Sequence, residues 1–439
     1  MASHEHTPRE GDEGMYPRNE RSVTYGETMY SRTRTMDSAY GSAGMYGRYA
    51  SGTYGSLASG KPGSLTDAAR ALRTRGFSQQ VGTHGMFLGE KINPNEPWPL
   101  DRPLRVSHIN TALLPAGIEY WLAALCRYSD PSRLQFIRTV VLSDWVDHRQ
   151  IPRMGMPVEV GGRESVVSAS TESDVLLVSD PGVDSEQVGQ WILEAKPAVT
   201  VFVAHGDGEY TRDRLSGIGP AVDHIVAVSR HVQREVCQGW PVSMIPNGVD
   251  PRRLVKTQPR EISRQALGFG DSDFVVGFVG RFSEEKNPQL VIDAVAQLPP
   301  RYKALLIGHG YMRSNLVEQC MASTPGRFVI LEGDGELGDL YASMDTLVMP
   351  SRLEGYGLVA MEAMMCGVPV IATPYGMIAD LVSDHVNALV VPPAASEIAR
   401  AAMELGEHPS LRSSVIAGGK RLANLTGYAS QMAREYERL

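Results

Sequence analysis

Two cations, Arg281 and Lys286, follow an apolar run that ends at Gly280. The segment reads VGFVGRFSEEKNP (276–288), and its Asn-Pro pair predicts the start of a helix, because proline is favoured in a first turn. A strand end, a glycine turn, two cations and a helix N-terminus suit a diphosphate. Arginine can grip two oxygens as a fork, while lysine acts as a point charge. The alternative is a surface turn whose cations pair with the two glutamates between them.

Two glutamates stand eight residues apart in a second segment, PSRLEGYGLVAMEAMMCGVPVIATP (350–374). Glu354 lies in a glycine-rich loop, and Glu362 lies on a helix expected over 358–366, ended by a glycine. Backbone N–H groups at 356–358 would face the ligand and take phosphate oxygens. A partly buried Glu362 needs partners, and the vicinal hydroxyls of a ribose or hexose are suitable. The alternatives are a solvated loop acid for Glu354 and a carboxylate satisfied by backbone or arginine for Glu362.

Short apolar runs alternate with helical segments and must position these residues. Near-continuous apolar strands separated by helices predict parallel sheets covered on both faces. Ligands of such sheets bind outside the carboxyl ends of the strands, so two facing sheets predict a cleft between domains. The predicted strands are 104–110, 136–142, 174–178, 198–204, 224–228 and 242–245 in a first set, and 274–280, 304–308, 327–331, 346–350 and 368–372 in a second.

The fold class is therefore α/β, with two doubly wound, Rossmann-like domains. Residues 1–60 hold one valine, one leucine and no Ile, Phe, Trp or Cys, which predicts a disordered tail. Its repeated Tyr-Gly pairs leave a second interpretation open, a partner-binding arm that orders on contact. The predicted divisions are a low-complexity tail (1–60), a short helix and extended arm (61–103), an N-terminal Rossmann-like domain (104–248), a C-terminal Rossmann-like domain (249–425) and a C-terminal helix packing back on the N-terminal domain (426–439).

Composition excludes several classes of protein. The chain has 439 residues and a net charge of −8, which argues against a surface that grips nucleic acid. Its four cysteines are far apart, which excludes a disulfide scaffold or cysteine-rich zinc site and fits a reducing compartment. We expect a soluble cytoplasmic protein, because no apolar run reaches the length of a membrane span and the N-terminus is polar. Peripheral contact with a membrane stays open through three arginines near an apolar helix, Arg127, Arg133 and Arg138.

Several ordered motifs carry a resemblance to a known family. GRFSEEKNPQLVIDAVAQL, LIGHG and PSRLEGYGLVAMEAMMCGVPVIAT resemble the retaining GT-B glycosyltransferases of family 4, the glycosyl transferases group 1. Glu354 and Glu362 match the E-x7-E motif of that family. Residues 225–229 and 244–250 look like its interdomain passage, and PAGIEYWL (115–122) looks like its G-G-x-E loop, with alanine in place of the first glycine. The resemblance covers roughly 104–439 and is stronger in the C-terminal domain.

The resemblance implies roles for five residues in catalysis and donor binding. Arg281 and Lys286 would hold the donor diphosphate and stabilise the leaving nucleotide. Glu354 would hydrogen-bond the transferred sugar, and Glu362 would bind the donor ribose. His205 follows the strand VTVFVA and would face the donor sugar near the reacting carbon. A strand-end histidine bonded to backbone is the alternative for His205.

The resemblance also implies a phosphate cradle built largely from backbone. Gly280 and the amides around Tyr356, Gly357 and Leu358 would line it from the C-terminal domain. Gly117, at the first strand-to-helix turn, would approach the phosphate or acceptor from the N-terminal domain.

The implied activity is transfer of a hexose from a nucleotide-diphosphate sugar to an acceptor hydroxyl, with retention. The acceptor would be a glycan, lipid-linked sugar, protein or small molecule. We expect no cofactor and no metal, because the two cations can stabilise the diphosphate. Two alternatives remain: a catalytically weak or inactive structural or assembly component that binds a protein partner or assembles with itself through residues 1–100, and another GT-B activity such as an epimerase or phosphorylase. Asp207 could assist catalysis or merely turn its loop.

Overall fold

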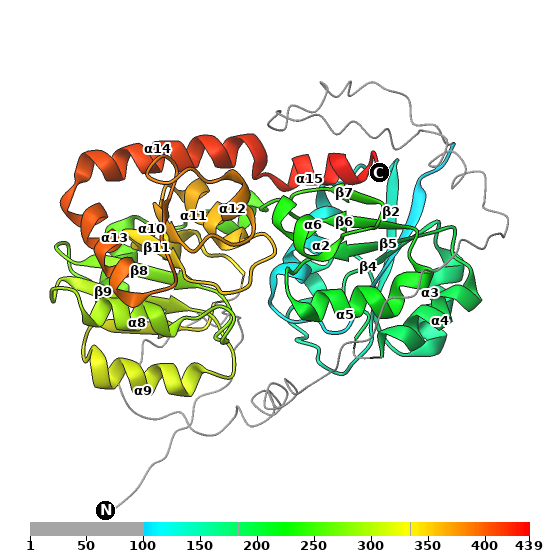
Figure 1. The fold of residues 1–439 in the computed structure, drawn as a ribbon, viewed down its shortest axis with the longest axis horizontal. Helices are drawn as coiled ribbons and strands as arrows, with labels where there is room; N and C mark the ends of the chain where they lie inside the picture. Colours follow the sequence, from blue (N-terminus) through cyan, green and yellow to red (C-terminus); the bar gives the residue numbers. More distant parts are fainter. Residues whose placement is uncertain (1–100, 183, 334) are drawn as a thin grey trace, which may run out of the picture.

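The computed structural model describes residues 101–182, 184–333 and 335–439, which form two lobes (Figure 1). The predicted tail (1–60) and all but the last three residues of the predicted arm (61–103) lie outside the described residues.

The first lobe is built on a seven-stranded, fully parallel sheet of order β3-β2-β1-β4-β5-β6-β7. Its strands are β1 (Leu104–Asn110), β2 (Leu134–Val141), β3 (Val158–Val160), β4 (Val175–Val178), β5 (Val199–Ala204), β6 (His224–Ala227) and β7 (Val242–Met244). Its helices are α2 (Gly117–Tyr128), α3 (Arg163–Glu172), α4 (Ser185–Ala195), α5 (Glu209–Ile218) and α6 (Arg230–Val236), with the 3-10 helices η1 (Ile151–Arg153) and η2 (Gly219–Ala221).

The second lobe is built on a six-stranded parallel sheet of order β10-β9-β8-β11-β12-β13. Its strands are β8 (Phe274–Val279), β9 (Tyr302–Ile307), β10 (Phe328–Leu331), β11 (Thr346–Met349), β12 (Val370–Ala372) and β13 (Leu389–Val390). Its helices are η3 (Pro251–Leu254), α7 (Arg260–Ala266), α8 (Gln289–Ala296), α9 (Arg313–Ser323), α10 (Gly338–Ser343), α11 (Leu358–Cys366), α12 (Met377–Leu381), α13 (Ala395–Glu407) and α14 (Pro409–Thr426).

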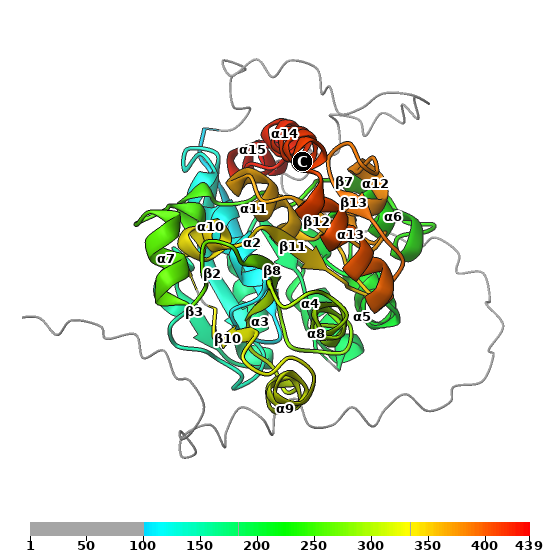
Figure 2. The same cartoon turned by 90° about the vertical axis from the view of Figure 1, so that its left-hand side faces the viewer.

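Both faces of the second sheet are buried, as its apolar strands predict. Along β8, Phe274, Val276 and Phe278 join one core cluster, while the intervening Val275 joins another. This alternation follows from the two-residue period of a strand. In the end-on view, α8 and α9 lie on one side of β8 and β11, and α11 and α14 lie on the other (Figure 2). The predicted fold class, two Rossmann-like α/β domains, is confirmed.

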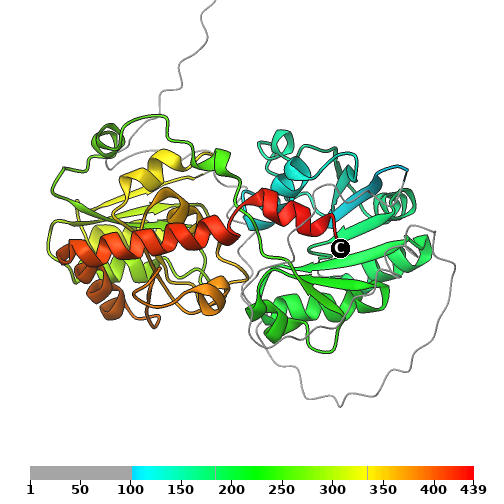
Figure 3. The ribbon, with the colours of Figure 1, turned by 90° about the horizontal axis from the view of Figure 1, so that it is seen from above.

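The last two helices link the lobes. Helix α14 lies over the second lobe, and α15 (Ala429–Tyr436) continues across to the first, where it packs on α2 (Figure 3). The Tyr436 ring lies 5.7 Å from that of Trp121. Val249, in the crossing between the sheets, forms a bridge with Tyr428 just before α15. The lobes are therefore held together by two chain crossings that lie side by side.

Two strands of the sheets were missing from the sequence-based prediction. β3 has three residues, one of them Glu159, and β13 has two, Leu389 and Val390. Neither strand is long enough to give an apolar run. Both lie at sheet edges, where a strand pairs with only one neighbouring strand. The helix predicted over 358–366 is confirmed at its predicted bounds.

Candidate active site

A cleft of about 570 Å³ lies between the two lobes, at the carboxyl ends of their strands. Strands β1, β4 and β5 lead into it from the first sheet, and β8, β9 and β11 lead into it from the second. This is where ligands of parallel α/β sheets bind. The cleft brings together all ten residues predicted to form the site: Gly117, His205, Gly280, Arg281, Lys286, Glu354, Tyr356, Gly357, Leu358 and Glu362.

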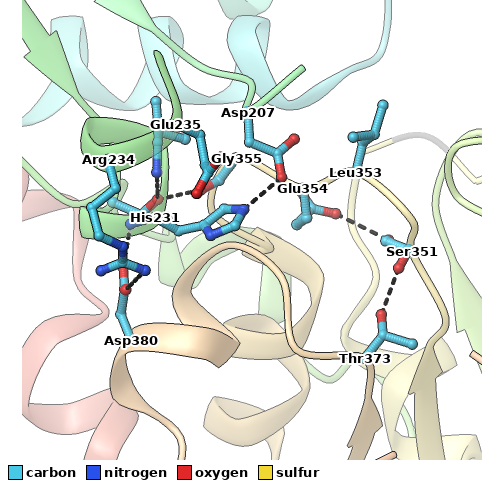
Figure 4. Close-up of polar contacts among 12 residues, drawn as sticks. Asp207, His231, Arg234, Glu235, Ser351, Leu353, Glu354, Gly355, Thr373 and Asp380 are labelled. Atoms are coloured by element: carbon cyan, nitrogen blue, oxygen red, sulfur yellow. Dashed lines mark hydrogen bonds and ion pairs between the residues drawn. The ribbon is translucent and has the colours of Figure 1, made fainter. Parts of the chain in front are cut away.

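Lys286 and Glu354 form an ion pair inside this cleft. Nζ of Lys286 lies 2.8 Å from Oε2 of Glu354, which also accepts a 3.2 Å hydrogen bond from the Ser351 hydroxyl. Thr373 in turn donates to the Ser351 carbonyl, so the loop is tied to β12 (Figure 4). The Glu354 side chain is only 14% exposed, so its interpretation as a solvated loop acid is wrong.

Arg281 makes a different pairing, with Glu285 four residues later in the same loop. This is one of the contacts that the surface-turn hypothesis anticipated. Both side chains are partly exposed, and such pairs contribute little to stability. The Arg281 guanidinium can therefore exchange this carboxylate for an anionic ligand at low cost.

Glu362 is buried on the first turns of α11 and is fully occupied by protein groups. Oε1 accepts a hydrogen bond from Nε of Arg253 at 3.2 Å, and Oε2 accepts one from the Tyr341 hydroxyl at 2.7 Å. The Arg253 guanidinium also stacks on the Tyr120 ring, 3.4 Å from its centroid. Burial and the Glu362 charge raise the pKa of the Tyr341 hydroxyl. Glu362 is thus bound by an arginine, as the alternative interpretation predicted, and it also lines the cleft.

The loop before α11 needs glycine at two positions. Gly357 has a φ of 95°, in the left-handed region. A Cβ on Gly355 would overlap the carbonyl oxygen of His205, which belongs to the other lobe. Ser229, at the start of α6, donates a 2.7 Å hydrogen bond to the Gly355 carbonyl. The glycine loop therefore contacts both the cleft and the opposite domain.

His205 follows β5 and lies against buried aromatic and polar groups. Its Nε2 is 3.2 Å from the Ser179 hydroxyl, and its ring packs edge-on against Trp121, with centroids 4.6 Å apart. Burial lowers the pKa of His205 to about 3, so the imidazole is neutral at pH 7. A neutral ring can donate or accept a hydrogen bond in the cleft but does not carry charge there.

Asp207 belongs to a second contact between the lobes. Its Oδ2 lies 2.7 Å from Nε2 of His231, whose backbone N–H donates to Asp380 of the C-terminal domain at 2.9 Å (Figure 4). Arg234 completes the cluster with a 3.2 Å ion pair to Asp380. Asp207 lines the cleft, but its carboxylate is already engaged in orienting His231.

Sequence reasoning missed several residues that shape the site. Arg253 and Tyr341 lie 109 and 21 residues from Glu362 along the chain, so no local pattern marks them. Glu119, in contrast, is marked by the sequence, because it occupies the glutamate position of the G-G-x-E loop. It is 5% exposed and lines the cleft.

The three arginines considered for membrane contact have acidic partners. Arg127 pairs with Asp250 at 2.8 Å, and Arg138 pairs with Glu159 and Glu172. Arg133 lies 4.0 Å from Asp130. These arginines are therefore part of the surface ion-pair pattern of the first lobe and do not form an unpaired basic face.

The described part of the chain holds neither a candidate metal site nor a candidate membrane-spanning helix. No cluster of three or more His, Cys, Asp or Glu side chains there has an arrangement that could hold a metal ion. Among the helices of residues 101–439, apart from positions 183 and 334, none is long and apolar enough to cross a bilayer.

Comparison with known protein sequences places the strongest similarity in the second lobe. Residues 259–422 match the family described as glycosyl transferases group 1. A D-inositol 3-phosphate glycosyltransferase of Corynebacterium jeikeium is 33% identical over 213 residues, which cover 42% of this chain and 51% of that protein. An uncharacterized glycosyltransferase of Methanocaldococcus jannaschii is 30% identical over 182 residues, covering 38% and 47% respectively. The match thus spans about half the length of these curated relatives.

Solved structures extend the likeness across both lobes. The Anabaena HepE protein in complex with UDP and glucose superposes with a TM-score of 0.67 at 23% identity, covering 76% of this chain and 98% of that one. Sucrose-phosphate synthase from Thermosynechococcus elongatus gives a TM-score of 0.60 at 19% identity, covering 76% and 97%. At these identities the likeness establishes the fold, which is GT-B. Residues 259–422 thus match the glycosyl transferases group 1, and the chain as a whole has the two-domain GT-B fold.

Proposed function

We propose that this protein is a glycosyltransferase that moves a hexose from UDP-hexose to an acceptor hydroxyl. The observation that carries the proposal is the convergence of Arg281, Lys286, Glu354, Glu362 and His205 on one interdomain cleft. The choice of UDP is supported by one neighbour of the same fold, Anabaena HepE, whose structures hold UDP or UDP-glucose.

The chemistry requires stabilisation of negative charge on the leaving diphosphate. Lys286 and Arg281 supply two cations beside Gly280, and the amides at the start of α11 add dipoles of the same sign. Because Lys286 is already oriented by Glu354, its ammonium is held near the place where the anion would form. We propose that these groups act without a metal or a resident cofactor.

The transferred sugar needs a fixed position. The carboxylate of Glu354 is anchored by Lys286 and Ser351 and has further lone pairs for sugar hydroxyls. Neutral His205, held by Ser179, offers a hydrogen bond from the opposite lobe without adding charge next to a carbon that becomes positive. Attack on the same face as the leaving group, and hence retention, is part of the proposal.

The test is a transfer assay with UDP-glucose and UDP-galactose, in which released UDP is measured with and without EDTA. Lys286→Ala should lower the rate by a factor of about 100 or more, the usual effect of removing one stabilising group of this kind. Lys303→Ala is the matched control, because Lys303 lies on β9 outside the cleft and pairs with Asp273. Equal activity of the two variants, or activity that EDTA abolishes, would contradict the assignment.

A further inference from the structure

Glu119 is a buried acid whose carboxyl group has an unexplained oxygen. It lies in the first turn of α2, is 5% exposed, and contributes to the cleft lining two residues after Gly117. Its Oε1 accepts a 3.0 Å hydrogen bond from the backbone N–H of Leu114 and lies 3.5 Å from the Asn110 amide. These contacts fix the carboxyl group and brace the turn that leads into α2.

The second oxygen, Oε2, is buried without any hydrogen-bond partner. Leaving a buried polar atom unsatisfied costs about 1–3 kcal/mol, and more for a charged group. Such an atom calls for a specific reason, and a ligand is one. Glu119 contributes to the lining of the cleft, so a ligand bound there can become the partner of Oε2 once a small movement of the carboxyl group uncovers this buried atom.

Two charged groups act on the Glu119 carboxyl from across the cleft and from the neighbouring strand. Arg281 follows β8 of the C-terminal domain and favours the ionised form, while Asp180 follows β4 and disfavours it. Burial is the largest influence and raises the pKa of Glu119 to about 7, against the lowering effect of hydrogen bonds from the backbone N–H groups of Leu114 and Glu119 itself and of the Arg281 charge. The group is therefore close to half protonated in neutral solution.

We propose that Glu119 binds the donor diphosphate in its protonated form, with Oε2–H donating a hydrogen bond to a phosphate oxygen. The site is the end of the cleft where Glu119 of the first lobe faces Arg281 of the second. The inference rests on the proposed function, because it uses the same cleft and the same class of ligand.

The protonated form is favoured by the charge of the ligand. An ionised Glu119 would repel a diphosphate, whereas the acid form offers a donor to it. Binding must then draw a proton from solution whenever the free protein carries an ionised Glu119. If Glu119 instead accepted a hydrogen bond from an acceptor hydroxyl, its ionised form would be the useful one and no proton would be taken up.

The experiment is calorimetric titration of the full chain with UDP-glucose at pH 8 in buffers of different ionisation enthalpy. UDP-glucose is the probe because both of its phosphates are esterified, which removes the terminal phosphate ionisation of free UDP near neutral pH. We expect uptake of about one proton for each nucleotide bound, and affinity that falls about tenfold per pH unit above pH 7. Binding without proton uptake would overturn the inference while leaving the proposed function intact.

Two variants locate the proton. Glu119→Gln keeps a donor at the position of Oε2, so it should bind UDP-glucose with no proton uptake and with affinity independent of pH between 7 and 9. Glu164→Gln is the matched control, because Glu164 is an exposed acid in the first turn of α3 in the same lobe, and it should behave like the wild type. Unchanged proton uptake in Glu119→Gln would refute the assignment. Failure of the wild type to bind UDP-glucose at all would overturn the proposed function together with this inference.

Discussion

At the scale of single residues, the cleft is a set of charged groups that are already oriented before a ligand arrives. Lys286 holds Glu354, Arg253 holds Glu362, and Glu285 holds Arg281. A bound diphosphate or sugar would share or replace these partners. Because the groups are held in place, little rotamer freedom remains to be lost when a donor binds.

Glu354→Gln tests the role of the first glutamate. The amide keeps the size of the side chain but removes the charge that orients Lys286, so we expect transfer to fall by a factor of about 100 or more through lost positioning. The melting temperature should change little, since the side chain lies in a loop. Glu318→Gln, an exposed acid on α9, is the control in the same assay. Normal turnover in Glu354→Gln would show that this carboxylate does not position the sugar.

Glu119→Gln makes a separate prediction about stability. The pKa of Glu119 is about 7 in the folded protein, above its ordinary value of 4.5, so the stability from this group is present below pH 4.5 and is lost as pH rises to about 7. The variant lacks that loss. As pH rises from 4.5 to 7, the free energy of unfolding of the variant should therefore increase relative to that of the wild type, by at most about 1.4 kcal/mol per pH unit. Above pH 7 the difference between the two proteins should stay constant. Urea unfolding of both proteins at pH 5, 6, 7 and 8 measures the difference, and parallel curves would exclude a raised pKa.

At the scale of elements, the short helix η3 links the second lobe to the first. Its residue Arg253 bonds Glu362 of α11 and stacks on Tyr120 of α2. Asp250, just before η3, accepts hydrogen bonds from Arg127 and Tyr128 of α2. The crossing between the domains therefore contributes Arg253 to the lining of the cleft and connects α2 with α11.

Arg253→Ala should be strongly destabilising. It leaves the buried Glu362 carboxylate without its cationic partner, a loss worth about 3–5 kcal/mol in comparable buried pairs. Arg252→Ala is the neighbouring control: the Arg252 side chain is 57% exposed and pairs with Asp250, so we expect a change within about 1 kcal/mol. Denaturant unfolding compares the two. A loss in Arg253→Ala as small as that expected for Arg252→Ala would mean that Arg253 acts only as a surface arginine.

The elements themselves were largely predictable, because each central strand is a continuous apolar run and α11 has a glycine at each end. The edge strands β3 and β13 were not, since two or three residues carry no periodic signal. Motif positions predicted which residues line the cleft. Their partners were not predictable, because Arg253, Tyr341 and His231 meet Glu362 and Asp207 only after the chain has folded.

At the scale of the whole molecule, two lobes share one hydrophobic core. A single cluster of buried residues runs from the first sheet through α15 to one face of the second sheet. The polar contacts of Ser229, His231 and Arg234 with Gly355 and Asp380 add a second seam beside the cleft. Opening or closing of the cleft must therefore involve both the crossing chain segments and this seam.

Removal of residues 1–60 tests whether the N-terminal segment belongs to the catalytic unit. Among the described residues the cleft lining runs from Asn110 to Glu362 and includes every residue assigned to the site, so we expect turnover of a small soluble acceptor to stay within about twofold of the full chain. Steady-state kinetics on the two proteins with UDP-glucose gives the comparison. A collapse of kcat in the shortened chain would place the segment in the active site, whereas unchanged kinetics leaves it a role in partner binding.

The central claim is that the interdomain cleft binds a nucleotide-diphosphate sugar. The most direct test measures thermal unfolding in the presence of UDP, GDP, ADP and their sugar conjugates, each with and without EDTA. A ligand at 100 times its dissociation constant should stabilise the protein by about 2.7 kcal/mol, an easily measured shift in Tm. We predict a response to UDP and UDP-hexose that EDTA does not change and that Lys286→Ala abolishes. A well-folded protein that responds to none of these nucleotides would contradict the account and favour an assembly role for this GT-B chain.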